Sequence, residues 1–174
     1  MKFCVINGSP KGKYSVTLQS IKYLEKKYNE HEFEVFNVGQ QIKAIEKDMS
    51  KVIKGMNDAD AIIFAYPVYT FIAPSQLHRF IELMKEHHID VSGKYATQIT
   101  TSKHFYDVTA HRYIQDNCLD LNMKYIKGLS CDMDDLLTEK GQSDVKKFFE
   151  FVCWSINNNL YESTNYEVLF YPGA

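Results

Sequence analysis

Five times along the chain, a short apolar run is followed by a stretch in which apolar residues recur at helical spacing. The apolar runs predict strands at residues 3–6, 33–38, 61–66, 94–101 and 123–129. Neighbouring parallel strands require a long crossover connection, and a helix in each connection provides it. The alternation therefore predicts an α/β fold in which a five-stranded parallel sheet is covered by helices on both faces.

The stretches between the strands predict where the helices lie. Residues 15–28 predict the first helix, and one apolar stripe over residues 42–56 predicts a single second helix. Pro74 suits the first position of the next helix, because its missing N–H would be unpaired there in any case. Asp107 is placed to cap the helix after it. A last stripe, over residues 145–156, predicts the helix that completes the fold.

The length of 174 residues is typical of one domain. We expect a domain that spans residues 1–160 and a tail that spans residues 161–174. Residues 166–171 of this tail have a β-like composition but follow the complete fold. Three alternatives stay open for the tail: an added edge strand, an arm in an oligomer, or the start of a further region.

The first predicted strand leads into a polar loop, residues 7–17 (NGSPKGKYSVT), and the loop leads into the first helix. Two glycines allow the backbone to approach a ligand closely. Three hydroxyls and two lysines add donors and positive charge, and the helix start offers unpaired N–H groups. These properties predict a phosphate site. The alternative is an ordinary strand–helix loop, capped by Ser15 or Thr17, that binds nothing.

Several known phosphate motifs do not fit this loop. A nucleotide P-loop has four residues between its first glycine and its Gly-Lys pair, followed by serine or threonine. Here three residues separate Gly8 from Gly12, and Tyr14 follows Lys13. The dinucleotide pattern G-x-G-x-x-G is absent, and no cysteine is followed six residues later by an arginine, as a phosphatase loop would require.

The loop resembles the first loop of the NADPH-dependent FMN reductase family, within the flavodoxin-like fold. The shared positions are Gly8, Ser9, Pro10, Lys11, Gly12, Lys13, Ser15 and Thr17. The sequence departs from the family at Tyr14 and Val16, where asparagine is usual. The resemblance implies strand order 2-1-3-4-5 and an FMN phosphate held by this loop, with Val16 inside the site. The residues that we expect to hold the phosphate are Ser9, Lys11, Ser15 and Thr17.

Two further loops complete the predicted site, because flavodoxin-like sheets bind FMN where the strand order reverses. The loop after the third strand is similar to the family's second loop, which surrounds the flavin ring; it contains Pro67, Val68, Tyr69, Thr70 and Phe71. The loop after the fourth strand offers donors to the carbonyl edge of the ring, namely Thr101, Ser102 and His104. The alternative is that the aromatic residues of both loops only cover the end of the sheet.

The resemblance implies an FMN-dependent oxidoreductase that takes electrons from NADH or NADPH and passes them to a flavin, a quinone or a similar small acceptor. No catalytic acid or base is assigned, since the flavin itself accepts hydride. Two alternative functions stay open: a non-enzymatic electron carrier of flavodoxin type, which docks to a protein partner, and a relative of this fold that has lost its flavin, which the departure at Val16 suggests. The resemblance also implies a homodimer.

Composition favours no other class of function. The net charge of −2 gives no strong field for nucleic acid or a membrane surface. No apolar run approaches membrane-spanning length, and a cytoplasmic location is the expectation. Four scattered cysteines, Cys4, Cys118, Cys131 and Cys153, are expected to be small core residues rather than ligands of a metal or an iron–sulfur cluster.

Overall fold

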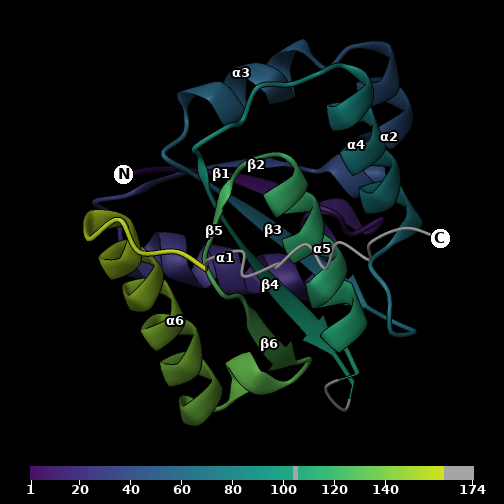
Figure 1. The fold of residues 1–174 in the computed structure, drawn as a ribbon. Coiled ribbons are helices and arrows are strands. Elements are labelled where there is room, and N and C mark those ends of the chain that lie inside the picture. Colours follow the sequence, from purple (N-terminus) through teal and green to yellow (C-terminus); the bar gives the residue numbers. More distant parts are fainter. Residues whose placement is uncertain (104–105, 163–174) are drawn as a thin grey trace, which may run out of the picture.

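The computed structural model describes residues 1–103 and 106–162 (Figure 1). Its sheet has the order β2-β1-β3-β4-β5, and every pair of neighbouring strands is parallel. A further strand, β6, also pairs with β4 in parallel. The predicted flavodoxin-like order is therefore confirmed, with one strand more than expected. The strands are β1 (Lys2–Asn7), β2 (Glu32–Phe36), β3 (Ala61–Val68), β4 (Tyr95–Ser102), β5 (Lys124–Tyr125) and β6 (Leu129–Asp132).

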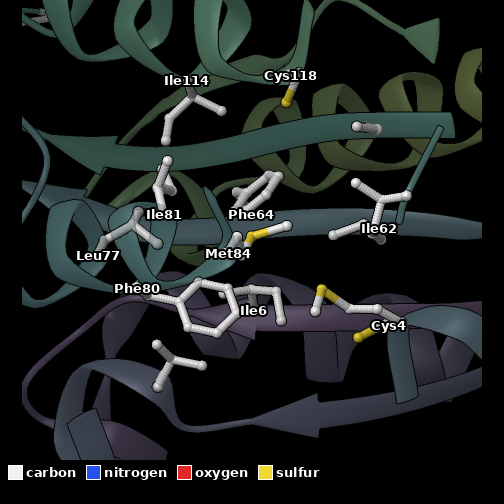
Figure 2. Close-up of a cluster of buried hydrophobic side chains, with 14 of the residues drawn as sticks. Cys4, Ile6, Ile62, Phe64, Leu77, Phe80, Ile81, Met84, Ile114 and Cys118 are labelled. Carbon is white, nitrogen blue, oxygen red and sulfur yellow. The ribbon is translucent and has the colours of Figure 1, made fainter. Parts of the chain in front are cut away.

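Helices cover both faces of the sheet, as predicted (Figure 1). Helices α1 and α6 pack on the face that contains Phe3 and Val5, and α2 to α5 pack on the face that contains Cys4 and Ile6 (Figure 2). Alternate residues of β1 thus enter opposite cores, which explains its uninterrupted apolar run. The helices are α1 (Val16–Lys27), α2 (Val38–Lys47), α3 (Ser50–Asp58), α4 (Ser75–Glu86), α5 (Val108–Asp120) and α6 (Glu139–Asn157), with short 3-10 turns η1 (Gly12–Tyr14) and η2 (Asp135–Leu137).

The predicted fifth strand, 123–129, is wrong in detail, because it is divided into β5 and β6. Ala96 pairs with Tyr125, and Ile99 pairs with Leu129. Three steps along β4 therefore match four steps along its partner, so one extra residue bulges out between the two short strands. Gly128 lies at this bulge, and a methyl group there would collide with the buried side chain of Gln98.

The prediction of one helix over residues 42–56 is also wrong. Asp48 is extended (φ −152°, ψ 107°), and its carboxylate accepts a 2.9 Å hydrogen bond from the N–H of Ser50. An aspartate that bonds the backbone two residues on competes with helical pairing, so one helix ends and α3 begins. Val38, expected to end the second strand, instead begins α2. Pro74 lies one residue before α4, at the N-cap position with an extended backbone.

Three of the four cysteines are buried, as expected for small core residues. Cys4, Cys118 and Cys131 are at most 3% exposed, while Cys153 is only partly buried. Burial raises the pKa of the Cys4 and Cys131 thiols to about 12. These thiols are therefore protonated, which makes them poor nucleophiles and poor metal ligands. Within residues 1–103 and 106–162, no helix is both long and apolar enough to cross a membrane.

Candidate functional site

Three loops meet at the carboxyl edge of the sheet because β1, β3 and β4 are direct neighbours. Asn7, at the end of β1, pairs with Ala65, and Val68, at the end of β3, pairs with Ser102 at the end of β4. The chain leaves the sheet after each of these strand ends. The first loop runs from β1 to α1, the second from β3 to α4, and the third from β4 to α5. The sequence prediction that these segments converge is confirmed.

The first loop is organised by Asn7, whose side chain is fully buried. Its amide nitrogen donates to the carbonyl oxygen of Gly12 (3.0 Å) and to Oδ1 of Asn37 (2.9 Å). Its amide oxygen accepts from the backbone N–H of Ser9 (3.2 Å). Both N–H groups and the oxygen of this buried amide are therefore hydrogen-bonded, and these bonds fix the conformation of the loop. Sequence reasoning did not assign this role to Asn7.

Much of the loop backbone bonds within the loop itself. The N–H of Lys11 donates to the hydroxyl of Ser9 (3.2 Å), and the N–H of Gly12 donates to the Ser9 carbonyl (3.1 Å). Gly12 has a positive φ of 54°, and a methyl group there would collide with the side chain of Gln40. The N–H groups of Ser9, Lys11 and Gly12 thus already have acceptors and are not open donors for a ligand.

The start of α1 has the properties of an anion site. Ser15 occupies the N-cap position, but its hydroxyl makes no capping bond. The side chain is 1% exposed, and its Oγ has no hydrogen-bond partner among the described residues. The first N–H groups of a helix, here those of Val16 and Thr17, have no acceptor within the helix. An unpaired buried hydroxyl costs roughly 1–3 kcal/mol, which a ligand at this position would recover.

The other predicted residues of the first loop are placed as follows. Ser9 is fully buried, and Lys11 is exposed. Val16, 44% exposed, is the first residue of α1. Thr17 is fully buried, and its hydroxyl oxygen lies 2.6 Å from that of Thr101. This contact joins the first turn of α1 to the end of β4, so the first and third loops share one hydrogen-bonded junction.

The second loop presents aromatic rings outside the sheet. Pro67 and Val68 are the last residues of β3 and are buried, whereas Thr70 is exposed in the loop. The side chains of Tyr69 and Phe71 are 55% and 57% exposed. They were predicted to contact a flavin ring, and flat apolar surfaces of this kind suit one.

A tight turn holds Phe71 outward. The N–H of Ile72 donates to the carbonyl of Thr70 (2.8 Å), and Phe71 between them has φ 63°. A non-glycine residue rarely adopts this conformation. The ring of Phe71 meets that of Tyr106 edge to face, with centroids 5.6 Å apart. The second and third loops are thereby in contact.

The third loop begins with buried hydroxyls. Thr101 is 2% exposed and bonds Thr17, while the Oγ of buried Ser102 has no hydrogen-bond partner in the described part of the chain. Ser15 and Ser102 are thus two unpaired buried hydroxyls at loops that the Thr17–Thr101 contact connects. His104, the third predicted donor, lies outside the described residues.

Sequence reasoning missed the part that Asp107 plays in this loop. Asp107 stands at the N-cap of α5, as expected, but its carboxylate does not cap the helix. Instead, its Oδ2 accepts from the hydroxyls of Thr100 in β4 (2.6 Å) and Ser130 in β6 (2.5 Å). Nε2 of His111 lies 3.4 Å from the same oxygen and 2.8 Å from the Thr100 hydroxyl. Because Thr100 gives its proton to Asp107, His111 is the donor to Thr100.

The carboxylate of Asp107 is ionised in this setting although it is only 4% exposed. Burial alone would raise the pKa of Asp107, but the hydrogen bonds from His111, Ser130 and Thr100 hold that pKa well below its ordinary value. The negative charge also lies at the positive end of α5, which favours it. Asp107 therefore fixes the end of the third loop against three elements, β4, β6 and α5.

A family model described as NADPH-dependent FMN reductase matches residues 1–130, a span that includes the three loops. No curated protein matches the chain by sequence. Solved structures share the fold at low identity. The chain is similar to an FMN-dependent NADH-azoreductase from Bacillus anthracis in complex with FMN, with a TM-score of 0.64 and 15% identity, over 91% of this chain and 99% of the azoreductase.

Two other solved structures are similar to a comparable degree. An NADH:FMN oxidoreductase in its apo form aligns with a TM-score of 0.70 and 15% identity, over 94% of this chain and 91% of that protein. A flavodoxin from Fusobacterium nucleatum, bound to flavin mononucleotide, aligns with a TM-score of 0.65 and 14% identity, over 88% of this chain and 98% of the flavodoxin. At these identities the likeness establishes the fold.

Proposed function

The chain belongs to the NADPH-dependent FMN reductase family, and on this basis we propose that it is an oxidoreductase that uses bound FMN to pass electrons from NADH or NADPH to a flavin, a quinone or a similar small acceptor. The observation that carries the proposal is the open start of α1, where the Ser15 hydroxyl is buried without a partner in the described chain. A phosphate group would satisfy that hydroxyl and the adjacent N–H groups together.

In this proposal four side chains hold the phosphate. Ser15 donates its hydroxyl, and Lys11 contributes positive charge from the exposed side of the loop. The hydroxyl of Ser9 already accepts a bond from the Lys11 N–H, so its own proton is available to the ligand. In the Thr17–Thr101 pair either hydroxyl can be the donor; when Thr101 donates, the proton of Thr17 is available to the phosphate.

The second and third loops are proposed to bind the ring. Tyr69 and Phe71 supply apolar surface, and the unpaired hydroxyl of Ser102 is a donor for the carbonyl edge. Bound FMN would supply hydride acceptance and electron transfer in one or two steps. The chain's own residues hold and orient the ring and keep water from its buried edge. Thr101 and His104 stay proposed members of this set.

We also propose a homodimer that buries the exposed apolar residues beside the site. The side chains of this surface are more than half exposed: Tyr69, Phe71, Ile72, Tyr106 and Val108. Exposed apolar side chains gathered on neighbouring loops in this way are typical of an interface. Sedimentation equilibrium of the FMN-loaded protein at micromolar concentration tests the proposal, and a monomeric mass would refute it. A cytoplasmic location and the domain limits 1–160 and 161–174 stay predictions.

Anaerobic mixing tests the enzymatic function. The FMN-loaded protein is mixed with NADH and, separately, with NADPH, and the flavin absorbance is followed. We expect at least one nucleotide to bleach the flavin. If neither does so within minutes while an added reductase protein does, the chain is an electron carrier of flavodoxin type instead.

A further inference from the structure

Helix α6 carries an aromatic surface that the sheet does not cover. The side chains of Phe151 and Trp154 are 48% and 54% exposed, and their rings lie nearly parallel with centroids 6.3 Å apart. Leu160 and Tyr161, which follow the helix, are 46% and 49% exposed. Four large apolar side chains gathered in this way are characteristic of a binding surface.

Two adjoining hollows lie along this side of α6. One has a volume of about 300 Å³, and its wall includes Trp154 and Tyr161. The other has a volume of about 330 Å³, and its wall includes Leu129 and Phe148. Both are lined by Lys127 and Phe151, so the two hollows form one groove between α6 and residues 126–129. We call this the α6 groove.

The chain itself returns to the α6 groove after the helix ends. The N–H of Leu160 donates to the carbonyl of Ser155 (2.8 Å), which reverses the chain direction. The N–H of Glu162 then donates to the carbonyl of Tyr125 in β5 (2.7 Å), and Glu162 lines the first hollow. Residues 163–174, which lie outside the described residues, therefore begin at the mouth of the groove.

We propose that residues 168–171 (Val-Leu-Phe-Tyr) of this same chain occupy the α6 groove. These four apolar residues match the apolar part of the groove lining, which includes Leu129, Phe151 and Trp154. Charge agrees as well, because the second hollow is lined by two lysines, Lys127 and Lys147, and one carboxylate, Asp144, while Glu167 directly precedes the apolar run. The proposal does not depend on the flavin or on any catalytic activity.

The length of the tail fits the length of the groove. The wall that α6 provides extends from Ser155 back to Asp144, which is roughly 16 Å at the helical rise per residue. Six residues lead from Glu162 to Val168, and they span at most about 20 Å when extended. The apolar run therefore reaches the second hollow without a long free loop.

Trp154 is the only tryptophan of the chain and lines the α6 groove, so its fluorescence reports directly on the occupant. In the full-length chain we compare the parent with Phe170→Asp. The matched control is Asn165→Asp, which adds the same charge to the polar part of the tail. All three proteins are measured at equal flavin content.

We expect Phe170→Asp to shift the Trp154 emission to longer wavelength and to raise its acrylamide quenching constant about twofold, since the ring loses its cover. Asn165→Asp should leave both unchanged. Identical emission and quenching in all three proteins would overturn the proposal. Protection of Trp154 that appears only as protein concentration rises, together with a dimeric mass, would place the tail in a second copy and also overturn it.

A second measurement uses the parent alone and needs no variant to fold. Amide hydrogen exchange is followed for residues 126–129 and 168–171. If the tail occupies the α6 groove, the amides of residues 168–171 exchange more slowly than those of residues 163–166. Exchange of all tail amides at the rate of an unstructured peptide would contradict the proposal.

Discussion

The hydroxyl oxygens of Thr17 and Thr101 lie 2.6 Å apart, although 84 positions separate these residues in the chain. Both side chains are at most 2% exposed. The bond ties the first turn of α1 to the end of β4, and thus the proposed phosphate site to the proposed ring site. A single hydroxyl pair therefore couples the geometry of two loops.

We predict that Thr17→Val weakens FMN binding about tenfold or more and lowers the free energy of unfolding of the apoprotein by about 1–3 kcal/mol. The variant removes one hydroxyl and leaves that of Thr101 buried without its partner. Thr17→Ser, which keeps the hydroxyl, is the control and should retain most of both properties. FMN titration measures the affinity, and urea unfolding measures the stability. If Thr17→Val equals the parent in both FMN affinity and free energy of unfolding, the hydroxyl pair does not have the role proposed for it.

We predict that Val16→Asn tightens FMN binding. Val16 is the first residue of α1 and is 44% exposed, but its side chain has no donor for a phosphate. An asparagine amide would add one. Val16→Ala removes the β-branch without adding a donor and serves as the control. If Val16→Asn binds FMN no better than Val16→Ala does, the side chain at this position does not face the phosphate.

Asp107→Asn is predicted to lower the free energy of unfolding at pH 7 by about 1–3 kcal/mol, because it replaces an ionised acceptor of buried hydrogen bonds. The folded-state pKa of Asp107 is lowered, so the carboxylate's contribution is complete above the unfolded value of about 3.9 and is lost as pH falls through the folded pKa.

The difference in stability between parent and Asp107→Asn should therefore shrink as the pH falls from 5 to below about 4. Urea unfolding across this range measures it. Asp134→Asn, at an exposed carboxylate, is the control and should have little effect. A difference that stays the same at low pH would show that the charge of Asp107 contributes nothing.

We predict that Gly12→Ala destabilises the fold and weakens FMN binding, while Gly93→Ala only destabilises. Both glycines have positive φ, 54° and 74°, so each alanine suffers backbone strain of roughly 1–2 kcal/mol. At Gly12 the added methyl group also meets the side chain of Gln40, whereas at Gly93 it meets open space. Urea unfolding and FMN titration separate the two effects. If both variants lose the same free energy of unfolding and the same FMN affinity, the Gln40 side chain moves away from the added methyl group at no cost.

Local sequence determines much of this fold. The strands β1, β3 and β4 were predictable because both of their faces are buried and most of their residues are apolar or small. The division of β5 from β6 was not, since the extra residue is visible only in the register against β4. The break at Asp48 was hidden because the apolar stripe keeps helical spacing across it.

In the candidate site, too, local sequence predicted some residues and not others. The first and second loops were identified from their own residues and from the resemblance that they carry. Asn7 and Asp107 were not, because their partners Asn37 and Ser130 are distant in sequence and come together only when the sheet forms. The sequence predicted that Asp107 caps a helix. Asp107 does occupy the N-cap position of α5, but its carboxylate does not bond the helix N–H groups.

The start of α1 is proposed to bind the phosphate of FMN. The most direct measurement compares the affinities of FMN and riboflavin, which lacks the phosphate, for the parent, for Ser15→Ala, and for Ser50→Ala as an exposed serine at another helix start. We expect the parent and Ser50→Ala to bind FMN far more tightly than riboflavin. In Ser15→Ala this preference should fall about tenfold, as one charge-assisted hydrogen bond is lost. Equal affinity of the parent for FMN and riboflavin, or an unchanged preference in Ser15→Ala, would contradict the account.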